Sequence, residues 1–385
     1  MNDTSTVGGL TASFRKITSR RRKQGAFGRW WNGLAKTTRT IILVTLVAYL
    51  YVLPTYPPPF VKTPESDWAT VLASGMVIYA LAALGLNVVV GWCGLLDLGY
   101  VGFYAVGAYT AAVLGSQHAN LPWLLCLPIA VVVSMLFGLV LGAPTLRLRG
   151  DYLAIVTLGF GEIIRITAIN SNWLGSTRGI KNIPAPPNIG PVKFNTSDAR
   201  GIYYLGLSMI LVVVFLLHRI ESSRVGRAWT AIREDEDAAE MMGVPTFRFK
   251  LWAFAIGAGV GGLAGVLNAG VYPGYISPSS FELRLSILFL AAVVLGGTGN
   301  MAGAILGGAL VSYMPERFRN FSDKRYFVFG VILVIMMVVR PEGLIPRRRA
   351  GRTLPAEAID RPDSPGLAGA DLEETITYRG DVAHG

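Results

Sequence analysis

Long apolar runs alternate with short polar connections along most of this chain. A helix needs about 20 mainly apolar residues to cross the hydrocarbon core of a bilayer, and most of the runs approach that length. The pattern therefore predicts an all-α, polytopic integral membrane protein with about ten transmembrane helices. We expect them near residues 41–53, 69–91, 95–115, 122–143, 152–170, 202–218, 250–272, 283–297, 300–314 and 326–340.

Glycine is frequent in the range 95–115 and in the short adjacent pair 283–297 and 300–314. Glycines inside apolar helices allow two backbones to approach closely, and they also allow helices to break. Broken or re-entrant helices are therefore an alternative in these ranges. Two Gly-x-x-Gly segments, 91–94 and 296–299, each end one apolar run and open the next, which leaves an internal repeat open.

Composition supports the membrane class. Hydrophobic residues make up 52% of the 385 residues and charged residues 15%, with a mean hydropathy of +0.47. Soluble globular domains carry about a quarter charged residues. Cys93 and Cys126 both lie in apolar surroundings, so neither a disulfide framework nor a metal-ligand pattern is supported.

The formal net charge of +11 is concentrated beside the membrane segments, in residues 15–39 before the first span and 340–352 after the last. Positive residues that flank spans mark the cytoplasmic side, so both termini and the 219–250 loop are expected inside. The 171–200 loop is then outside. The basic loop at 317–325 departs from this rule, because it falls outside in the span count. Anionic lipid headgroups explain the basic clusters more simply than a nucleic-acid partner.

The organisation that follows has three parts. Residues 1–40 form a basic cytoplasmic leader, and 41–345 form the transmembrane domain. Residues 346–385 are rich in Asp, Glu, Pro and Gly without a periodic apolar face, which predicts a disordered cytoplasmic tail.

Polar residues within apolar sequence are candidates for function, because a polar group at membrane depth usually faces a cavity, a bundle interior or a partner. Asn87, Asp97, Tyr100 and Tyr104 are therefore candidates for a translocation path. For Asp97 we favour the alternative that it caps a helix that begins near Leu98. For the aromatic residues the alternative is packing between helices.

Glu162 and Arg165 are spaced i, i+3 in an apolar helix and predict a structural ion pair. The chain offers few further ionisable groups for a proton relay, which argues against a proton-coupled carrier. The phosphate-binding pattern G-x-x-x-x-G-K-[ST] is not found, and the three histidines lie at span ends or in the tail. We therefore expect no catalytic, cofactor or metal site on this chain.

The segment 228–242, between two spans, is dense in charge and predicts one helix at the bilayer surface. Gly243 is expected to end it and Pro245 to stop it. Its apolar stripe consists of Ala228, Ile232, Ala239 and Met242. The stripe could rest on the bilayer, but an anionic inner leaflet would repel the acidic run 234–237, which favours a groove in a protein partner.

The chain resembles the permease subunit of branched-chain amino acid ABC importers of the LivM type. The resemblance is carried by residues 85–109, 146–159, 226–243 and 295–303, and it extends over roughly 75–345. The version 97–100, Asp-Leu-Gly-Tyr, is more similar to the amino-acid branch than to permeases for urea or short-chain amides. The long basic leader and the acidic tail depart from the compact family pattern.

The resemblance implies a multi-pass protein of the plasma membrane, with a second permease subunit, two ATPase subunits that use ATP, and an extracytoplasmic substrate-binding protein. It also implies that segment 226–243 is a coupling helix that docks in a groove of an ATPase subunit. The alternatives are a urea or amide permease, and a channel or ion-coupled secondary transporter. The expected coupling residues are Gly226, Arg227, Ala228, Ile232, Glu234, Asp235, Ala238, Ala239 and Gly243.

Overall fold

The structure is a computed structural model. It describes residues 36–56, 67–116, 120–148, 150–188, 194, 199–271, 274–318, 325–340 and 342–346. Residues 1–35 of the expected leader and 347–385 of the expected tail lie outside the described residues. The same holds for 319–324, most of the basic loop that departs from the charge rule.

The described residues confirm the all-α prediction. A continuous helix over Trp68–Trp92 consists of α4 (Trp68–Thr70), the π-helical turns η1 (Val71–Met76) and η2 (Asn87–Trp92), and α5 (Val77–Leu86) between them. Short 3-10 turns η3 (Asn172–Leu174), η4 (Ser176–Arg178) and η5 (Pro278–Phe281) lie in loops. The other helices are α3 (Lys36–Val52), α6 (Tyr100–Gly115), α7 (Trp123–Thr145), α8 (Asp151–Asn170), α9 (Arg200–Glu221), α10 (Arg224–Glu234), α11 (Glu236–Met241), α12 (Thr246–Ala269), α13 (Leu283–Gly296), α14 (Met301–Arg317) and α15 (Arg325–Val339).

Among the described residues, five helices are long and apolar enough to cross a membrane. They are Trp68–Trp92, α7, α8, α9 and α12. Helices also form in the other five ranges that the sequence predicts, but they are shorter, with 14 residues in α13 and 16 in α6.

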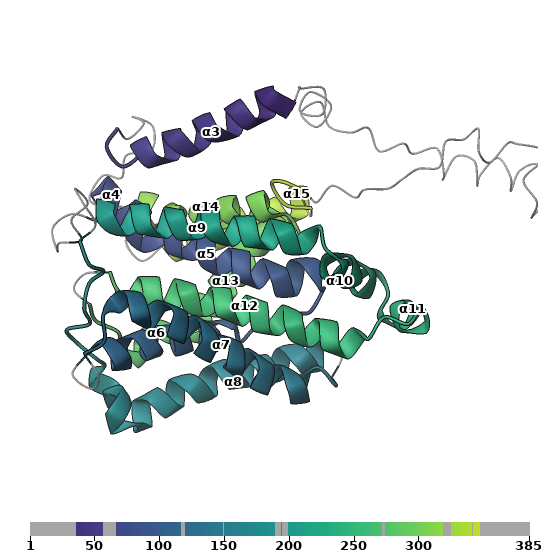
Figure 1. The fold of residues 1–385 in the computed structure, drawn as a ribbon, viewed down its shortest axis with the longest axis horizontal. Helices are drawn as coiled ribbons and strands as arrows, with labels where there is room; N and C mark the ends of the chain where they lie inside the picture. The colour runs from purple at the N-terminus through teal and green to yellow at the C-terminus, as the bar shows by residue number, and fades with distance from the viewer. Residues whose placement is uncertain are drawn as a thin grey trace, which may run out of the picture. The chain divides into compact units, whose positions relative to one another are not determined.

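Helix α12 lies at the centre of the bundle, where it packs against α5, α6 and α7 (Figure 1). Helix α5 also contacts α9, α13 and α14. In the most apolar windows of Trp68–Trp92 and α12, 72% of the residues are buried, against 28% for α7 and α8. The first two helices are therefore core elements, whereas α7 and α8 form part of the outer layer.

Glycines allow the close approach of α6 and α12. A Cβ atom on Gly107 would lie 2.2 Å from the carbonyl oxygen of Gly262, and one on Gly265 would lie 2.0 Å from that of Tyr104. Neither position can hold a larger residue without displacing a backbone. Tight packing thus accounts for these glycines.

The chain between η2 and α6 is not helical, so the expected span start at 95 is wrong. Helix α6 begins at Tyr100 after Gly99, and Asp97 is not its N-cap. The Asp97 carboxylate instead accepts the Gly99 N–H at 2.9 Å, which closes a local turn. The backbone of Leu98 bonds to the Thr157 hydroxyl of α8 at 3.1 Å and to the Ser286 hydroxyl of α13 at 2.5 Å. Neighbouring helices thus satisfy the backbone N–H and carbonyl of Leu98 within the break.

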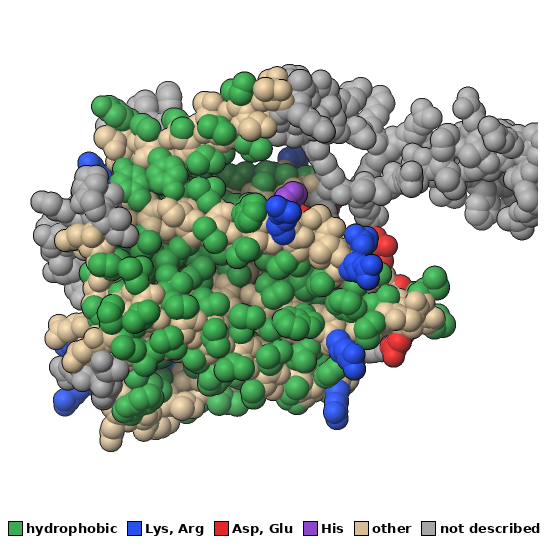
Figure 2. Space-filling model, viewed as in Figure 1, with side chains coloured by type: hydrophobic (Ala, Val, Ile, Leu, Met, Phe, Trp, Pro, Cys, Tyr) green, Lys and Arg blue, Asp and Glu red, His purple; other side chains and the backbone are tan. Residues whose placement is uncertain are grey.

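Large apolar side chains cover the side of the bundle (Figure 2). They include Leu125, Val132 and Val140 of α7 and Ile155 and Ile163 of α8, all of which are exposed. Charged side chains gather instead at the end that carries α10 and α11. This division is that of a protein with an apolar belt and a polar end.

Candidate functional site

The polar segment between α9 and α12 forms two helices, not the single helix predicted over 228–242. The chain breaks at Asp235, whose backbone is extended with φ −159° and ψ 113°. Its carboxylate accepts the Ala238 N–H at 2.9 Å and so caps the N-terminus of α11. Glu236 and Asp237 follow in the first turn, where negative charge is favoured by the helix dipole. The acidic run therefore starts a second helix.

The end of α11 is as predicted. Gly243 has φ +82°, a left-handed conformation that favours glycine. The Val244 N–H bonds to the Ala239 carbonyl at 3.0 Å, and the Gly243 N–H bonds to that of Glu240 at 2.9 Å. This pair of bonds is a Schellman motif, which ends the helix.

The predicted docking stripe is wrong for three of its four residues. Ala228, Ile232 and Ala239 are buried within this chain, because short links to α9 and α12 hold the apolar face against the bundle. Of the stripe, Met242 alone is outside, 85% exposed, and Met241 beside it is 82% exposed. Of the other expected coupling residues, Gly226 is buried, whereas Arg227, Glu234, Asp235, Ala238 and Gly243 are exposed.

Two contacts that the sequence did not predict fix the pair of helices α10 and α11 to the bundle. The Trp229 ring of α10 stacks on Trp92 of η2, with centroids 6.0 Å apart, and its N–H donates to the Phe249 carbonyl at 2.7 Å. Lys250 of α12 forms an ion pair with Glu236 of α11. The pair is thus anchored at both of its helices.

A third contact joins α10 to segments far away in the sequence. The Arg233 guanidinium donates to the Gly91 carbonyl and, at 3.2 Å, to the Thr298 hydroxyl. These acceptors belong to the two Gly-x-x-Gly segments, 91–94 and 296–299. The segments also bond to each other, because the indole N–H of Trp92 donates to the Gly299 carbonyl at 3.2 Å.

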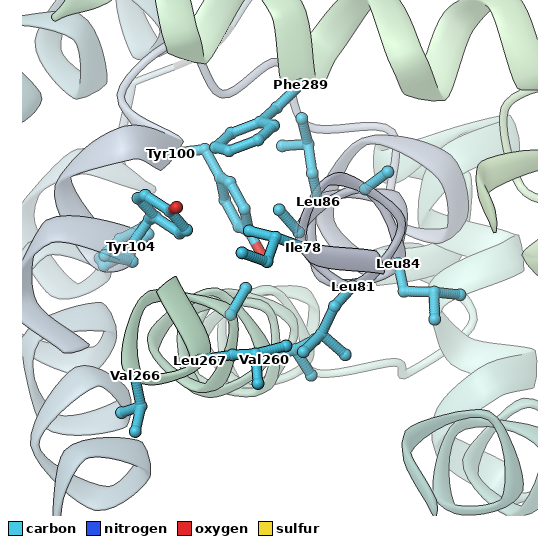
Figure 3. Close-up of a cluster of buried hydrophobic side chains, with 14 of the residues drawn as sticks. Ile78, Leu81, Leu84, Leu86, Tyr100, Tyr104, Val260, Val266, Leu267 and Phe289 are labelled. Atoms are coloured by element: carbon cyan, nitrogen blue, oxygen red, sulfur yellow. The ribbon is translucent and has the colours of Figure 1, made fainter. Parts of the chain in front are cut away.

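The four candidate path residues are all buried in the bundle. The Asn87 side-chain oxygen accepts the Gly299 N–H at 2.8 Å, and the Tyr100 hydroxyl donates to the Gly257 carbonyl of α12 at 3.0 Å. Figure 3 shows Tyr100, Tyr104 and Phe289 close together beside α12. Tyr104 packs edge-on against Phe289 at 5.4 Å. The contacts of Tyr100 and Tyr104 favour the packing interpretation for these two aromatic residues.

Comparison with known proteins agrees with this architecture. Residues 69–339 match the family model described as the permease component of branched-chain amino acid transport systems. The chain belongs to this family.

Individual relatives of this permease family are similar over most of the chain. The LivM permease of the high-affinity branched-chain amino acid transport system of Salmonella typhimurium is 42% identical, over 72% of this chain and 70% of the relative. BraD, a permease of the same kind from Pseudomonas aeruginosa, is 29% identical over 72% of this chain and 95% of its own length. The LivH permease of Escherichia coli is 26% identical over 70% and 91%. No solved structure matches this chain at a significant level.

The permease carries the predicted ion pair within α8. Arg165 Nε donates to the two carboxylate oxygens of Glu162 at 3.1 and 3.0 Å. The pair is not buried, since the Glu162 side chain is 38% exposed and that of Arg165 25%. Exposed Ile163 and Ile166 lie beside it. Two charged groups are thus placed near the middle of an apolar span, on its outer side.

Proposed function

We propose that this chain is a membrane-spanning subunit of an ABC importer that carries branched-chain amino acids across the plasma membrane. Membership of the permease family supports this function, and the similarity to LivM and BraD, permeases of branched-chain amino acid transport systems, indicates the substrate class. ATP is hydrolysed by separate subunits in this proposal, and this chain binds no cofactor of its own.

The topology that we propose has ten spans with both termini in the cytoplasm. The five long helices each cross, and α3, α6, α13, α14 and α15 complete the set. At 1.5 Å per residue α13 is only about 21 Å long, so the α13–α14 hairpin crosses a locally thinned or protein-filled part of the membrane. The α10–α11 end, where charges gather, is then cytoplasmic.

The exposed C-terminal end of α11 supports a role in coupling to an ATPase subunit. Met241 and Met242 are almost fully exposed although they are apolar, and the neighbouring Asp237 and Glu240 are exposed as well. Exposed apolar anchors with a polar rim are typical of a protein interface. We propose that these methionines, not the buried stripe, enter the groove of an ATPase subunit.

A second permease subunit is supported by α8. Ionisable groups at the depth of a bilayer face a protein interior or a water-filled path, and lipid does not cover them well. The half-exposed Glu162–Arg165 pair therefore marks a face that a second permease subunit covers.

We propose that four buried residues shape the translocation path indirectly, because they lie behind the helices that line it, around the break before α6. They are Asn87, Asp97, Tyr100 and Tyr104. The opposite end of the bundle, with η3 and η4, faces an extracytoplasmic substrate-binding protein.

Purification and reconstitution test the function. The tagged chain, expressed with its partner subunits, should retain two ATPase subunits and one further permease subunit. In liposomes with the binding protein, the complex should take up leucine, isoleucine or valine only with ATP. Uptake driven by a sodium or proton gradient without ATP would identify an ion-coupled carrier. ATP-driven uptake of urea in place of these amino acids would identify the amide branch.

A further inference from the structure

Arg233 lies where three parts of the fold meet. It belongs to the last turn of α10, and its guanidinium bonds to the Gly91 carbonyl at the end of η2 and to the Thr298 hydroxyl in the α13–α14 turn. These acceptors are 142 and 65 residues away in the sequence. The aliphatic part of the side chain is packed too, since a Cβ atom on Gly94 would lie 2.9 Å from Arg233 Cγ.

The two segments that Arg233 bridges form one unit. The Gly299 carbonyl accepts the Trp92 indole N–H at 3.2 Å, and the Gly299 N–H donates to Asn87 at 2.8 Å. Both segments turn sharply, with φ +77° at Gly94 and φ +115° at Gly297. A Cβ atom on Gly91 would lie 2.5 Å from the Gly299 nitrogen, so the backbones are in direct contact.

A second residue of α10 contacts this unit one turn earlier in the helix. Trp229, at position i−4 relative to Arg233, stacks on Trp92. Side chains four residues apart share one helix face, so α10 holds the end of η2 with two residues. The planar guanidinium presents donors in a fixed fork that can reach two acceptors at once, which a lysine ammonium cannot reproduce.

We propose that Arg233 is the positioning residue through which movement of the α10–α11 pair is transmitted to the ends of η2, α13 and α14. This inference rests on the proposed function and adds a separable step to it. Met241 and Met242 provide the docking contact, whereas Arg233 is half-buried and points into the bundle. Loss of Arg233 should therefore uncouple ATP hydrolysis from transport without releasing the ATPase subunits.

The test uses the complete reconstituted importer and measures amino acid taken up per ATP hydrolysed. Arg233→Lys and Thr298→Val are the principal variants, because both are mild changes, and Arg233→Ala is the complete deletion. Arg224→Lys, on an exposed residue in the first turn of the same helix, is the matched control. Arg233→Lys should keep the bound ATPase subunits and lower uptake per ATP by about tenfold, as expected for the loss of charge-assisted bonds. Thr298→Val, which removes one bond, should lower it by about threefold.

The outcomes separate the two ideas. An unchanged uptake per ATP in Arg233→Lys and Thr298→Val would overturn the role of Arg233, as would loss of the ATPase subunits in step with uptake. A wild-type chain that retains no ATPase subunit would instead overturn the proposed function itself. A fall in amino acid taken up per ATP hydrolysed in Arg233→Lys and Thr298→Val, but not in Arg224→Lys, supports transmission through Arg233.

Discussion

Lys250, near the start of α12, forms an ion pair with Glu236, the first residue of α11, and the lysine side chain is only 4% exposed. A buried ammonium group depends on its partner, because no water replaces a lost carboxylate there. Glu236→Gln should therefore lower the free energy of unfolding by about 1–3 kcal/mol. Thermal unfolding in detergent measures this. The double variant Glu236→Leu with Lys250→Met should recover part of the loss, and equal stability of the single variant and wild type would contradict the prediction.

Charge placed at the tip of α11 should release the ATPase. Met241→Glu with Met242→Glu changes two exposed side chains, so the chain itself should fold normally. Retention of the ATPase subunits on the tagged chain should fall at least about tenfold. The reason is that each methionine would be buried in the interface of the complex, where such an anchor contributes about 1–2 kcal/mol or more. Thr177→Glu, exposed at the other end of the bundle, is the control and should retain them.

Asp97 should tolerate loss of its charge but not of its acceptor. Asp97→Asn keeps an oxygen for the Gly99 N–H, so stability and uptake should stay close to wild type. Asp97→Ala leaves that buried N–H without an acceptor and should lower the free energy of unfolding by about 1–3 kcal/mol. Normal folding of Asp97→Asn combined with lost uptake would show that the charge has a direct role in transport.

Two glycines offer a matched pair for the packing of the bundle. Gly107→Ala places a methyl group on the backbone of Gly262 and should destabilise by about 1–3 kcal/mol. Gly159 of α8 has open space where a Cβ would be added. Gly159→Ala should therefore be neutral or stabilise by up to about 1 kcal/mol through helix propensity. Similar unfolding temperatures for the two variants would argue against the observed contact of α6 with α12.

The α8 ion pair tests the second permease interface. Replacement of Glu162 and Arg165 together by leucine suits an apolar belt, so the chain should still insert and fold. If a permease partner covers this face, that subunit should no longer co-purify. The single change Glu162→Gln leaves an unpaired arginine, whose insertion costs about 2.5–3.5 kcal/mol, and should lower the yield. Full retention of the partner by the leucine variant would place the interface elsewhere.

Local signals in the sequence were sufficient for much of the fold. Helices form in each predicted range, and Gly243 ends α11 because glycine, which has no Cβ atom, readily adopts a left-handed conformation. The break at Asp235 is not evident from the charge pattern alone, since the four consecutive acidic residues 234–237 are also compatible with one continuous polar helix. An N-cap signal was present, because Asp235 precedes an acidic first turn.

Long-range contacts explain what the sequence could not predict at the candidate site. Periodicity assigns Ala239 to an apolar helix face, but it does not show whether the bundle or a partner protein covers that face. The bonds of Arg233 with Gly91 and Thr298 depend on how distant helices come together. No local pattern distinguishes Arg233 from Arg227, which is exposed on the same helix.

The π-helical turn η2 makes the end of the helix Trp68–Trp92 tolerant of a single-residue deletion. Its hydrogen bonds enclose one more residue than those of an α-helix, so the turn accommodates an extra residue without shifting the phase of α5. Removal of Val89 should therefore restore α-helical bonding through the turn, while α5 and Trp92 keep their relative orientation. A gene that loses one codon here should still present the same face of α5 to α12, whereas loss of one codon within α5 would rotate one part of that helix relative to the other by about 100°.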